Sequence, residues 1–117
     1  MNAFPTLDAL SPLDGRYRAS TAALAAYFSE SAIIRYRIRV EVAYFEALTH
    51  LGLPGYPLPP ETAMKKLHAL PGAEGAASRV KEIEAVTNRD VKAVEYYLRE
   101  AFDTCGLSDY KELIHFG

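Results

Sequence analysis

Apolar residues recur at intervals of three and four positions in the longest patterned stretch of this chain, as they do on one face of an amphipathic helix. The residues concerned are Ile34, Ile38, Val42, Phe45 and Leu48. Ser29, before the stretch, is a good N-cap residue, and Gly52, after it, is a residue at which helices commonly stop. The pattern predicts a helix of roughly 30 Å, at about 1.5 Å per residue.

A second amphipathic stretch begins at Val91. Its apolar positions are Val91, Val94, Leu98, Ala101 and Phe102, and its polar positions are Lys92, Glu95 and Arg99, which the spacing places on the other side. Four polar residues, 87–90, precede it and predict a helix N-terminus with a kink near Thr87 to Arg89. Thr87 and Asp90 fit a variant of the capping box, whereas the free N–H groups of a helix start also suit an anionic ligand. Both interpretations stay open on the residues alone.

The rest of the chain is predicted to consist of shorter helices and the loops that connect them. Residues 1–18 are rich in turn formers and predict an irregular, extended arm, and residues 53–60 contain four prolines and predict a rigid connector. A small-residue loop is expected over residues 72–78. Further helices are expected over residues 20–27, 61–70 and 79–86, the last with Val80, Ile83 and either Val86 or Thr87 facing inward. Because no strand pattern of useful length occurs, we predict an all-α fold.

Composition narrows the functional classes. The 117 residues suffice for one domain, or for a fragment of a larger protein, with a modest core. Half of them are apolar and the net charge is -2, which excludes a disordered composition and nucleic-acid binding through bulk charge. The single cysteine, Cys105, rules out an internal disulfide and fits a reducing compartment. Without an apolar run of membrane-spanning length or a signal-peptide pattern, we expect a cytoplasmic protein and no membrane partner.

Candidate binding chemistry lies in the turn-rich arm. Ser11-Pro12 and Asp14-Gly15 mark consecutive turns that lead into Arg16 and Tyr17. Arginine presents a planar charged fork that suits phosphate or carboxylate, and tyrosine adds a hydroxyl on a rigid ring. The competing interpretation is a surface loop with a solvated arginine.

Other conspicuous side chains favour structural roles. Arg35, Arg37 and Arg39 are spaced by two, which scatters them around a helix, so solvated or salt-bridged arginines are expected. Tyr36 and Tyr44 favour core or subunit contact over a stacking platform. His68 is expected at the surface, and no metal site is expected because no second ligand sits at a suitable spacing.

Several segments together resemble the bacterial branch of the adenylosuccinate lyase family, within the fumarase/aspartase superfamily. They are residues 10–17 (LSPLDGRY), 28–30 (FSE), 37–42 (RIRVEV), 87–96 (TNRDVKAVEY) and 114–116 (IHF). The resemblance covers nearly the whole chain and is weakest over residues 52–78. It implies that residues 1–117 form the small helical N-terminal domain of a longer protein, without the central helical bundle and the C-terminal domain.

The resemblance also implies a reaction. The family eliminates fumarate from adenylosuccinate, giving AMP, and from its ribotide relative SAICAR, giving AICAR, in purine nucleotide synthesis, with no metal and no organic cofactor. Its catalytic base is a serine and its acid a histidine, both further along the chain, so no catalytic residue is expected here and the isolated chain should be inactive. The implied partners are the nucleotide substrate and further copies of the chain in a homotetramer.

Carried over by motif, the implied substrate-binding residues are Arg16, Tyr17, Asn88, Arg89 and Asp90. Many relatives have histidine where this chain has Arg89, whose guanidinium holds charge but does not shuttle protons. His115 is expected to be packed and structural, because its neighbours Ile114 and Phe116 are apolar and the family's polar Thr-Ser substrate segment lies just beyond Gly117. The alternatives are another fumarate-eliminating enzyme, such as argininosuccinate lyase, and a non-enzymatic helical interaction module.

Overall fold

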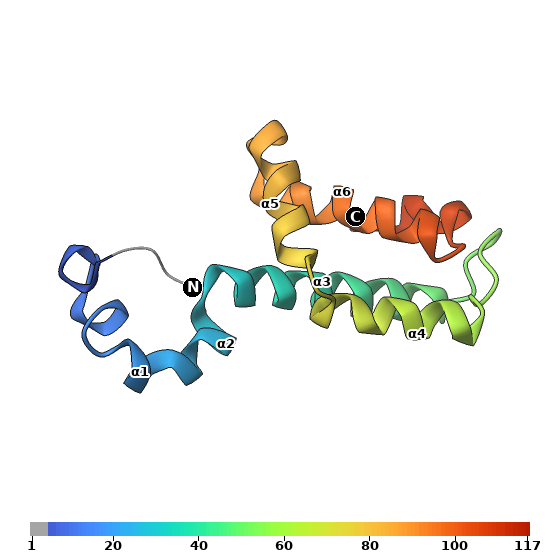
Figure 1. Ribbon diagram of the computed structural model, residues 1–117. Helices are drawn as coiled ribbons and strands as arrows, with labels where there is room; N and C mark the ends of the chain where they lie inside the picture. Colours follow the sequence, from blue (N-terminus) through green and yellow to red (C-terminus); the bar gives the residue numbers. More distant parts are fainter. Residues whose placement is uncertain (1–4) are drawn as a thin grey trace. The chain divides into compact units, whose positions relative to one another are not determined.

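The computed structural model describes residues 5–117, which form helices and connecting loops without a strand (Figure 1). The predicted all-α fold class is therefore confirmed. The chain divides into two compact units, Met1–Ile33 and Ile34–Gly117. Within the described residues, no helix combines the length and the apolar character that crossing a membrane requires.

The first unit consists of short helical pieces. They are the 3₁₀ helices η1 (Thr6–Asp8), η2 (Pro12–Asp14) and η3 (Ala22–Leu24) and the α-helices α1 (Arg18–Thr21) and α2 (Ala25–Phe28). The arm is turn-rich as predicted, but the expectation of an extended arm is wrong from Thr6 onward, and Met1 to Phe4 lie outside the described residues.

Residues 20–27 are helical as predicted, but the 3₁₀ turn η3 divides the segment into α1 and α2. The Thr21 hydroxyl donates to the Leu13 carbonyl at 2.9 Å and also lies 3.3 Å from the Arg18 carbonyl. Such side-chain bonds to the backbone compete with the regular helical ladder, and the helix is interrupted by a 3₁₀ turn at this point.

The longest helix, α3 (Glu30–Thr49), confirms the first prediction. The Ser29 hydroxyl accepts a hydrogen bond from the Ala32 N–H at 3.1 Å, as an N-cap does. All five residues of its predicted apolar face are buried. They form the base of the core of the second unit, in which Phe45 meets Phe102 edge to face with ring centroids 4.8 Å apart.

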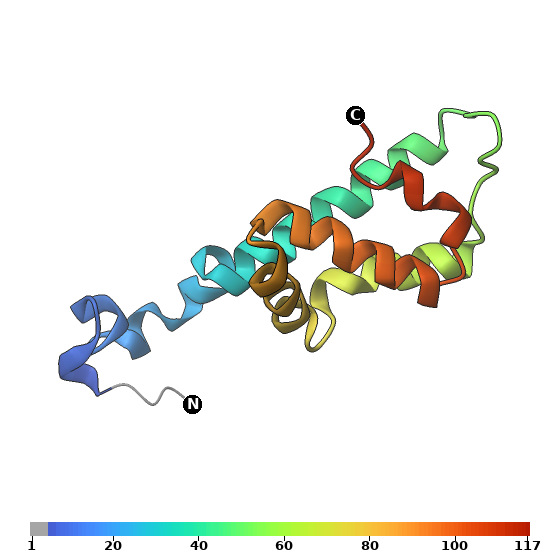
Figure 2. The ribbon, with the colours of Figure 1, turned by 90° about the horizontal axis from the view of Figure 1, so that it is seen from above.

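The connector over residues 53–60 is irregular as predicted and leads into α4 (Glu61–Ala69) and the 3₁₀ turn η4 (Leu70–Gly72). The Tyr110 hydroxyl donates to the Pro57 carbonyl at 2.6 Å and pins the connector to the core. In both ribbon views α4 runs beside α3 (Figures 1 and 2).

Helix α5 (Ala76–Thr87) begins three residues earlier than predicted, so the expected loop over residues 72–78 is too long. Gly75, at φ 81°, takes the left-handed conformation that turns the chain into the helix. Val80 and Ile83 face inward as expected, but Val86 is 85% exposed. The spacing of three and four passes through Thr87 and not Val86, and Thr87 is half-buried.

Helix α6 (Asp90–Thr104) follows after two residues, and the 3₁₀ helix η5 (Ser108–Leu113) completes the unit. Val94, Leu98, Ala101 and Phe102 are buried as predicted, but Val91 at the first turn is 44% exposed. The outward placement of Glu95 is also wrong: it is 8% exposed, and its carboxylate pairs with Lys92 at 3.0 Å and with Arg99 at 3.6 Å. These cations make burial at the edge of the apolar face tolerable.

Candidate functional site

The junction between α5 and α6 carries the second group of predicted binding residues. Asn88 adopts a left-handed conformation with φ 56°, and Arg89 is extended. Asparagine tolerates this region better than most residues. The predicted kink is therefore confirmed, and Asn88, Arg89 and Asp90 share one exposed turn at the start of a long helix.

The capping box predicted from Thr87 and Asp90 does not form. Thr87 is the last residue of α5, and its hydroxyl oxygen lies 3.4 Å from the Arg89 backbone nitrogen, at the edge of hydrogen-bond range. Asp90 is the first residue of α6, where its carboxylate accepts from the Val91 N–H at 2.8 Å. The shorter of the two hydrogen bonds at this helix start is therefore the one that Asp90 accepts from the Val91 N–H.

Asp90 is also tied to α3. Its Oδ2 lies 3.2 Å from Nη1 of Arg37, one of the three arginines for which a solvated or salt-bridged state was expected. The Val91 hydrogen bond, and then the Arg37 charge, hold the pKa of the Asp90 carboxyl below its usual range. Because Asp90 is ionised and engaged, the groups at this turn that remain available to an anion are Asn88 and Arg89, whose side chains form no hydrogen bond or ion pair within residues 5–117.

Arg16 and Tyr17 belong to the first compact unit. The Arg16 guanidinium carbon lies 5.0 Å from the centroid of the Tyr17 ring, a cation–π arrangement. Tyr17 is 46% exposed, and its N–H donates to the Pro12 carbonyl at 2.9 Å. The turn therefore presents a stacked Arg-Tyr pair at the surface.

Gly15 is required by close packing inside this turn. A Cβ at Gly15 would lie 2.7 Å from the Thr6 carbonyl oxygen and 3.0 Å from the Ala9 Cβ. Backbone at such a distance leaves no room for a side chain. The glycine of the Asp-Gly-Arg-Tyr motif is thus required for steric reasons, in addition to the chemistry of the other side chains.

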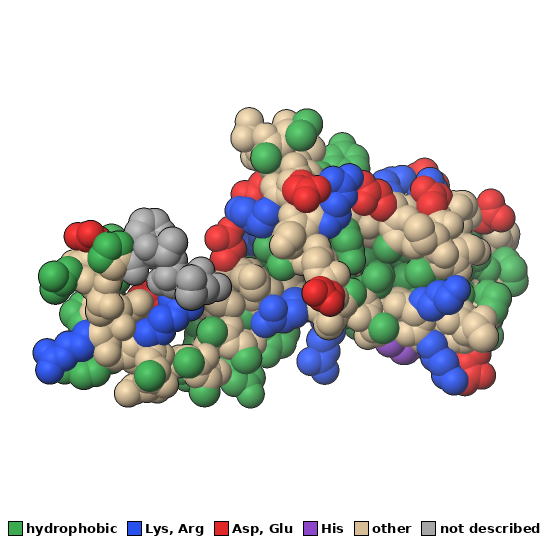
Figure 3. Space-filling model, viewed as in Figure 1, with side chains coloured by type: hydrophobic (Ala, Val, Ile, Leu, Met, Phe, Trp, Pro, Cys, Tyr) green, Lys and Arg blue, Asp and Glu red, His purple; other side chains and the backbone are tan. Residues whose placement is uncertain are grey.

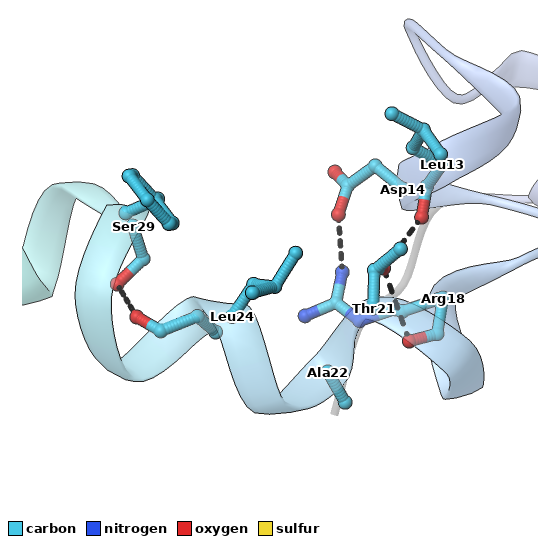
Figure 4. Close-up of a pocket in the computed structure, with 9 residues that line it drawn as sticks. Leu13, Asp14, Arg18, Thr21, Ala22, Leu24 and Ser29 are labelled. Carbon is cyan, nitrogen blue, oxygen red and sulfur yellow. Dashed lines mark hydrogen bonds and ion pairs between the residues drawn. The ribbon is translucent and has the colours of Figure 1, made fainter.

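A pocket in the same unit involves residues that sequence reasoning missed (Figure 4). It is lined by Leu13, Asp14, Arg18, Thr21, Ala22, Leu24, Ala25, Phe28 and Ser29. Arg18 Nη1 pairs with Asp14 Oδ1 at 3.2 Å, whereas Arg16 and Tyr17 do not line the pocket. The spacing of four between Asp14 and Arg18 is the signal that could have revealed the pair.

Other predicted side chains lie as follows. Tyr36 and Tyr44 are 40% and 41% exposed, so the core alternative is wrong and subunit contact stays a prediction. His68 is a surface residue as expected, with Nε2 3.1 Å from Glu46 Oε1.

The packed position expected for His115 is wrong, because its side chain is 51% exposed. Among residues 5–117, no three His, Cys, Asp or Glu side chains gather so as to hold a metal ion.

The charged surface is mixed in sign. Figure 3 shows acidic and basic side chains interspersed over α5 and α6. Arg79 on α5 donates to both carboxylate oxygens of Glu100 on α6, at 3.1 and 2.5 Å, and these bonds raise its pKa. Its Nη1 also donates to Glu82 at 2.9 Å. The Arg79–Glu100 pair connects α5 with α6, and the Arg79–Glu82 pair lies within α5.

Comparison with known proteins identifies the relatives of this chain. It is 43% identical to the adenylosuccinate lyase of Dictyostelium discoideum over an alignment that covers 95% of the chain, and 39% identical to that of Escherichia coli K12, again over 95%. The enzyme of Legionella pneumophila strain Corby is 46% identical over 82% of the chain. The chain is a homologue of adenylosuccinate lyase. No family model matches it.

The match concerns only part of these lyases. The chain spans about a quarter of the length of its curated relatives, with 25% of the Dictyostelium and Escherichia proteins covered and 22% of the Legionella protein. The predicted family resemblance is confirmed. The all-helical structure is consistent with the N-terminal domain of the fumarase/aspartase-like fold.

Proposed function

We propose that residues 1–117 are the N-terminal, substrate-binding part of an adenylosuccinate lyase. The identity of 39–46% to adenylosuccinate lyases over most of the chain carries this proposal. The relatives named above all bear that name, which favours this enzyme over argininosuccinate lyase and over an interaction module without activity. The proposed reactions release fumarate from adenylosuccinate and from SAICAR.

The role proposed for this chain is to hold the anionic nucleotide. Arg16 provides a guanidinium fork for phosphate or carboxylate, and Tyr17, stacked on it, provides a hydroxyl. At the start of α6, Asn88 and Arg89 offer an amide and a second guanidinium. Asp90, ionised and paired with Arg37, acts by fixing this turn and accepting hydrogen bonds.

The elimination itself requires a base that removes the proton next to a carboxylate and an acid that protonates the leaving nitrogen. Arg89 is unsuited to either task, since guanidinium stays protonated at any working pH. In this proposal the base and the acid come from the remaining three quarters of a longer polypeptide. The complete enzyme is a cytoplasmic homotetramer whose active sites combine several subunits, and it uses neither metal nor organic cofactor.

The direct test is fumarate release from adenylosuccinate. The isolated 117-residue chain should release none, and the complete reading frame should restore the reaction. If the complete polypeptide neither releases fumarate nor binds AMP, the lyase proposal is wrong and an interaction module is the better interpretation.

Within an active complete polypeptide, Arg89→Ala should raise KM by about 10- to 100-fold, the effect of one lost hydrogen bond to a charged group. The limbs of the pH–rate profile should be unchanged, because Arg89 moves no proton. Arg39→Ala, which removes an exposed arginine of α3, is the matched control and should leave KM unaltered. Loss of one limb in Arg89→Ala would contradict the binding role.

A further inference from the structure

Three polar side chains on one face of α3 hold segments that are distant in sequence. Arg37 pairs with Asp90, Glu41 Oε1 lies 2.7 Å from Nδ1 of His115, and the Tyr44 hydroxyl donates to the Phe116 carbonyl at 2.5 Å. Steps of four and three residues place the three side chains in one row along the helix. This row, called the α3 row below, holds the start of α6 and residues 115–116 against α3.

The Glu41 carboxylate is largely buried, and only one of its two oxygens has a hydrogen-bond partner within residues 5–117. Its side chain is only 14% exposed, and within residues 5–117 its Oε2 is buried without a hydrogen-bond partner. A buried carboxylate oxygen that lacks a donor costs free energy, and such atoms are uncommon in folded proteins. Among residues 5–117, the hydrogen-bond partner of this carboxylate is the His115 imidazole.

The backbone of His115 is also unusual. Its φ is 53°, in the left-handed region, and the only other non-glycine residue of the described chain with positive φ is Asn88 in the candidate binding turn. The neighbouring Ile114 is buried, whereas the His115 side chain is half exposed. Backbone strain of this kind is held in place by the surrounding contacts and is concentrated at functional sites.

The hydrogen bond to Glu41 defines the chemistry of the ring. A carboxylate oxygen accepts hydrogen bonds, so in this contact Nδ1–H of His115 donates a hydrogen bond to Oε1 of Glu41. Nε2, the second ring nitrogen, forms no hydrogen bond within residues 5–117. An imidazole ring with a proton on both nitrogens donates through Nε2–H to an anionic oxygen.

We propose that His115 contacts an anionic group of the substrate, a carboxylate or a phosphate, through Nε2, and that Glu41 is the positioning residue that orients its ring. The identity of the substrate rests on the function proposed above. The α3 row supports a shared site, because it holds His115 and the turn of Asn88 and Arg89 along one face of the same helix.

Two amide substitutions in the complete polypeptide separate this role from simple packing. The side-chain nitrogen of asparagine stands near the place of Nδ1, and that of glutamine near the place of Nε2. His115→Asn therefore keeps the bond to Glu41 and loses the outward donor, while His115→Gln keeps the outward donor. We expect His115→Asn to raise KM by about 10- to 100-fold with little change in kcat, and His115→Gln to stay within a few-fold of wild type.

The matched control is His68→Asn. His68 also pairs with a glutamate of α3 and has the same exposed fraction of 51%, but it has neither an unpartnered buried oxygen beside it nor a left-handed backbone. The His68→Asn enzyme should have the KM of the wild type. Glu41→Gln should raise KM in the wild-type background and have a smaller effect in His115→Ala, since a positioning residue acts through the group that it orients.

Inhibition by AMP, which keeps the phosphate but lacks the succinyl carboxylates, tells the two anionic groups apart. If His115→Asn weakens AMP inhibition as much as substrate binding, His115 contacts the phosphate; if AMP inhibition is unchanged, it contacts the succinyl group. The inference is overturned, while the lyase function stands, if His115→Asn leaves the KM of the active enzyme unchanged. It is also overturned if His115→Gln raises KM and His115→Asn does not. An inactive wild-type polypeptide would instead count against the proposed function.

Discussion

At the scale of single residues, Asp90 illustrates how one carboxylate serves two partners. It accepts from the Val91 N–H at the start of its own helix and pairs with Arg37 from α3. Both interactions favour the ionised form, which is why the pKa of Asp90 lies below its ordinary value. The turn of Asn88 and Arg89 is thereby held in place from two sides.

Because Asp90 has two partners, removal of one of them should restore its pKa only in part. Arg37→Ala should raise the pKa of Asp90 toward its ordinary value without fully restoring it, because the Val91 hydrogen bond is the larger cause of the shift. NMR titration of the Asp90 carboxyl carbon measures the change. Arg35→Ala, which removes a half-buried arginine outside the α3 row, should have no such effect. Complete restoration by Arg37→Ala would show that the backbone bond contributes nothing.

At the scale of elements, α3 connects most of what has been described. Its buried face builds the core, its opposite termini are defined by Ser29 and by the turn that leads to Gly52, and its α3 row holds two distant segments. One helix therefore supports the fold and positions the candidate binding residues.

The N-cap of α3 offers a test at this scale. Ser29→Ala removes the acceptor for the Ala32 N–H and should lower the free energy of unfolding by about 1 kcal/mol, as measured by urea denaturation. Ser31→Ala, two residues further in the same exposed first turn, should change it by less than about 0.5 kcal/mol. Equal effects of the two substitutions would argue against the cap.

Much of this element structure could be predicted from the sequence, and the exceptions have physical causes. The helices α3 and α4 have clear apolar periodicity and flanking stop signals, and both were predicted within a few residues. The interruption at Thr21 depends on a bond to Leu13, eight residues away, which periodicity does not reveal.

The candidate site is less accessible to sequence reasoning than the fold. The kink at Asn88 was predictable because polar residues separate two amphipathic stretches. In contrast, Arg37 and Asp90 are 53 residues apart, and Glu41 and His115 are 74 apart. Such pairs arise only from tertiary packing, so the exposure of His115 and its carboxylate partner were missed.

At the scale of the whole molecule, ion pairs on the surface govern the response to acid. The carboxyls of Asp90, Glu100 and Asp103 all have lowered pKa values, caused mainly by hydrogen bonds from the Val91 N–H, from Arg79 and from Lys111 respectively. A carboxyl with a lower pKa in the folded than in the unfolded state stabilises the fold above its unfolded pKa, near about 4.

The stability supplied by these groups should therefore be constant near neutral pH and be lost as the pH falls below about 4, through their folded-state pKa values. Urea denaturation between roughly pH 6 and pH 3 measures this loss. Glu100→Gln should make the decline shallower, because it removes one titrating group, whereas Glu74→Gln in the loop before α5 should not. An unfolding free energy that is independent of pH over this range would contradict the prediction.

The spacing of the α3 row has a consequence for insertions and deletions. Each residue of an α-helix turns the following side chains by about 100°. One residue inserted between Arg37 and Glu41 would swing Glu41 and Tyr44 to another side of the cylinder, although neither would be altered chemically. Seven inserted residues would restore the direction to within about 20° but displace the partners by about 10 Å. The length of this part of α3 is therefore as constrained as the identity of its side chains.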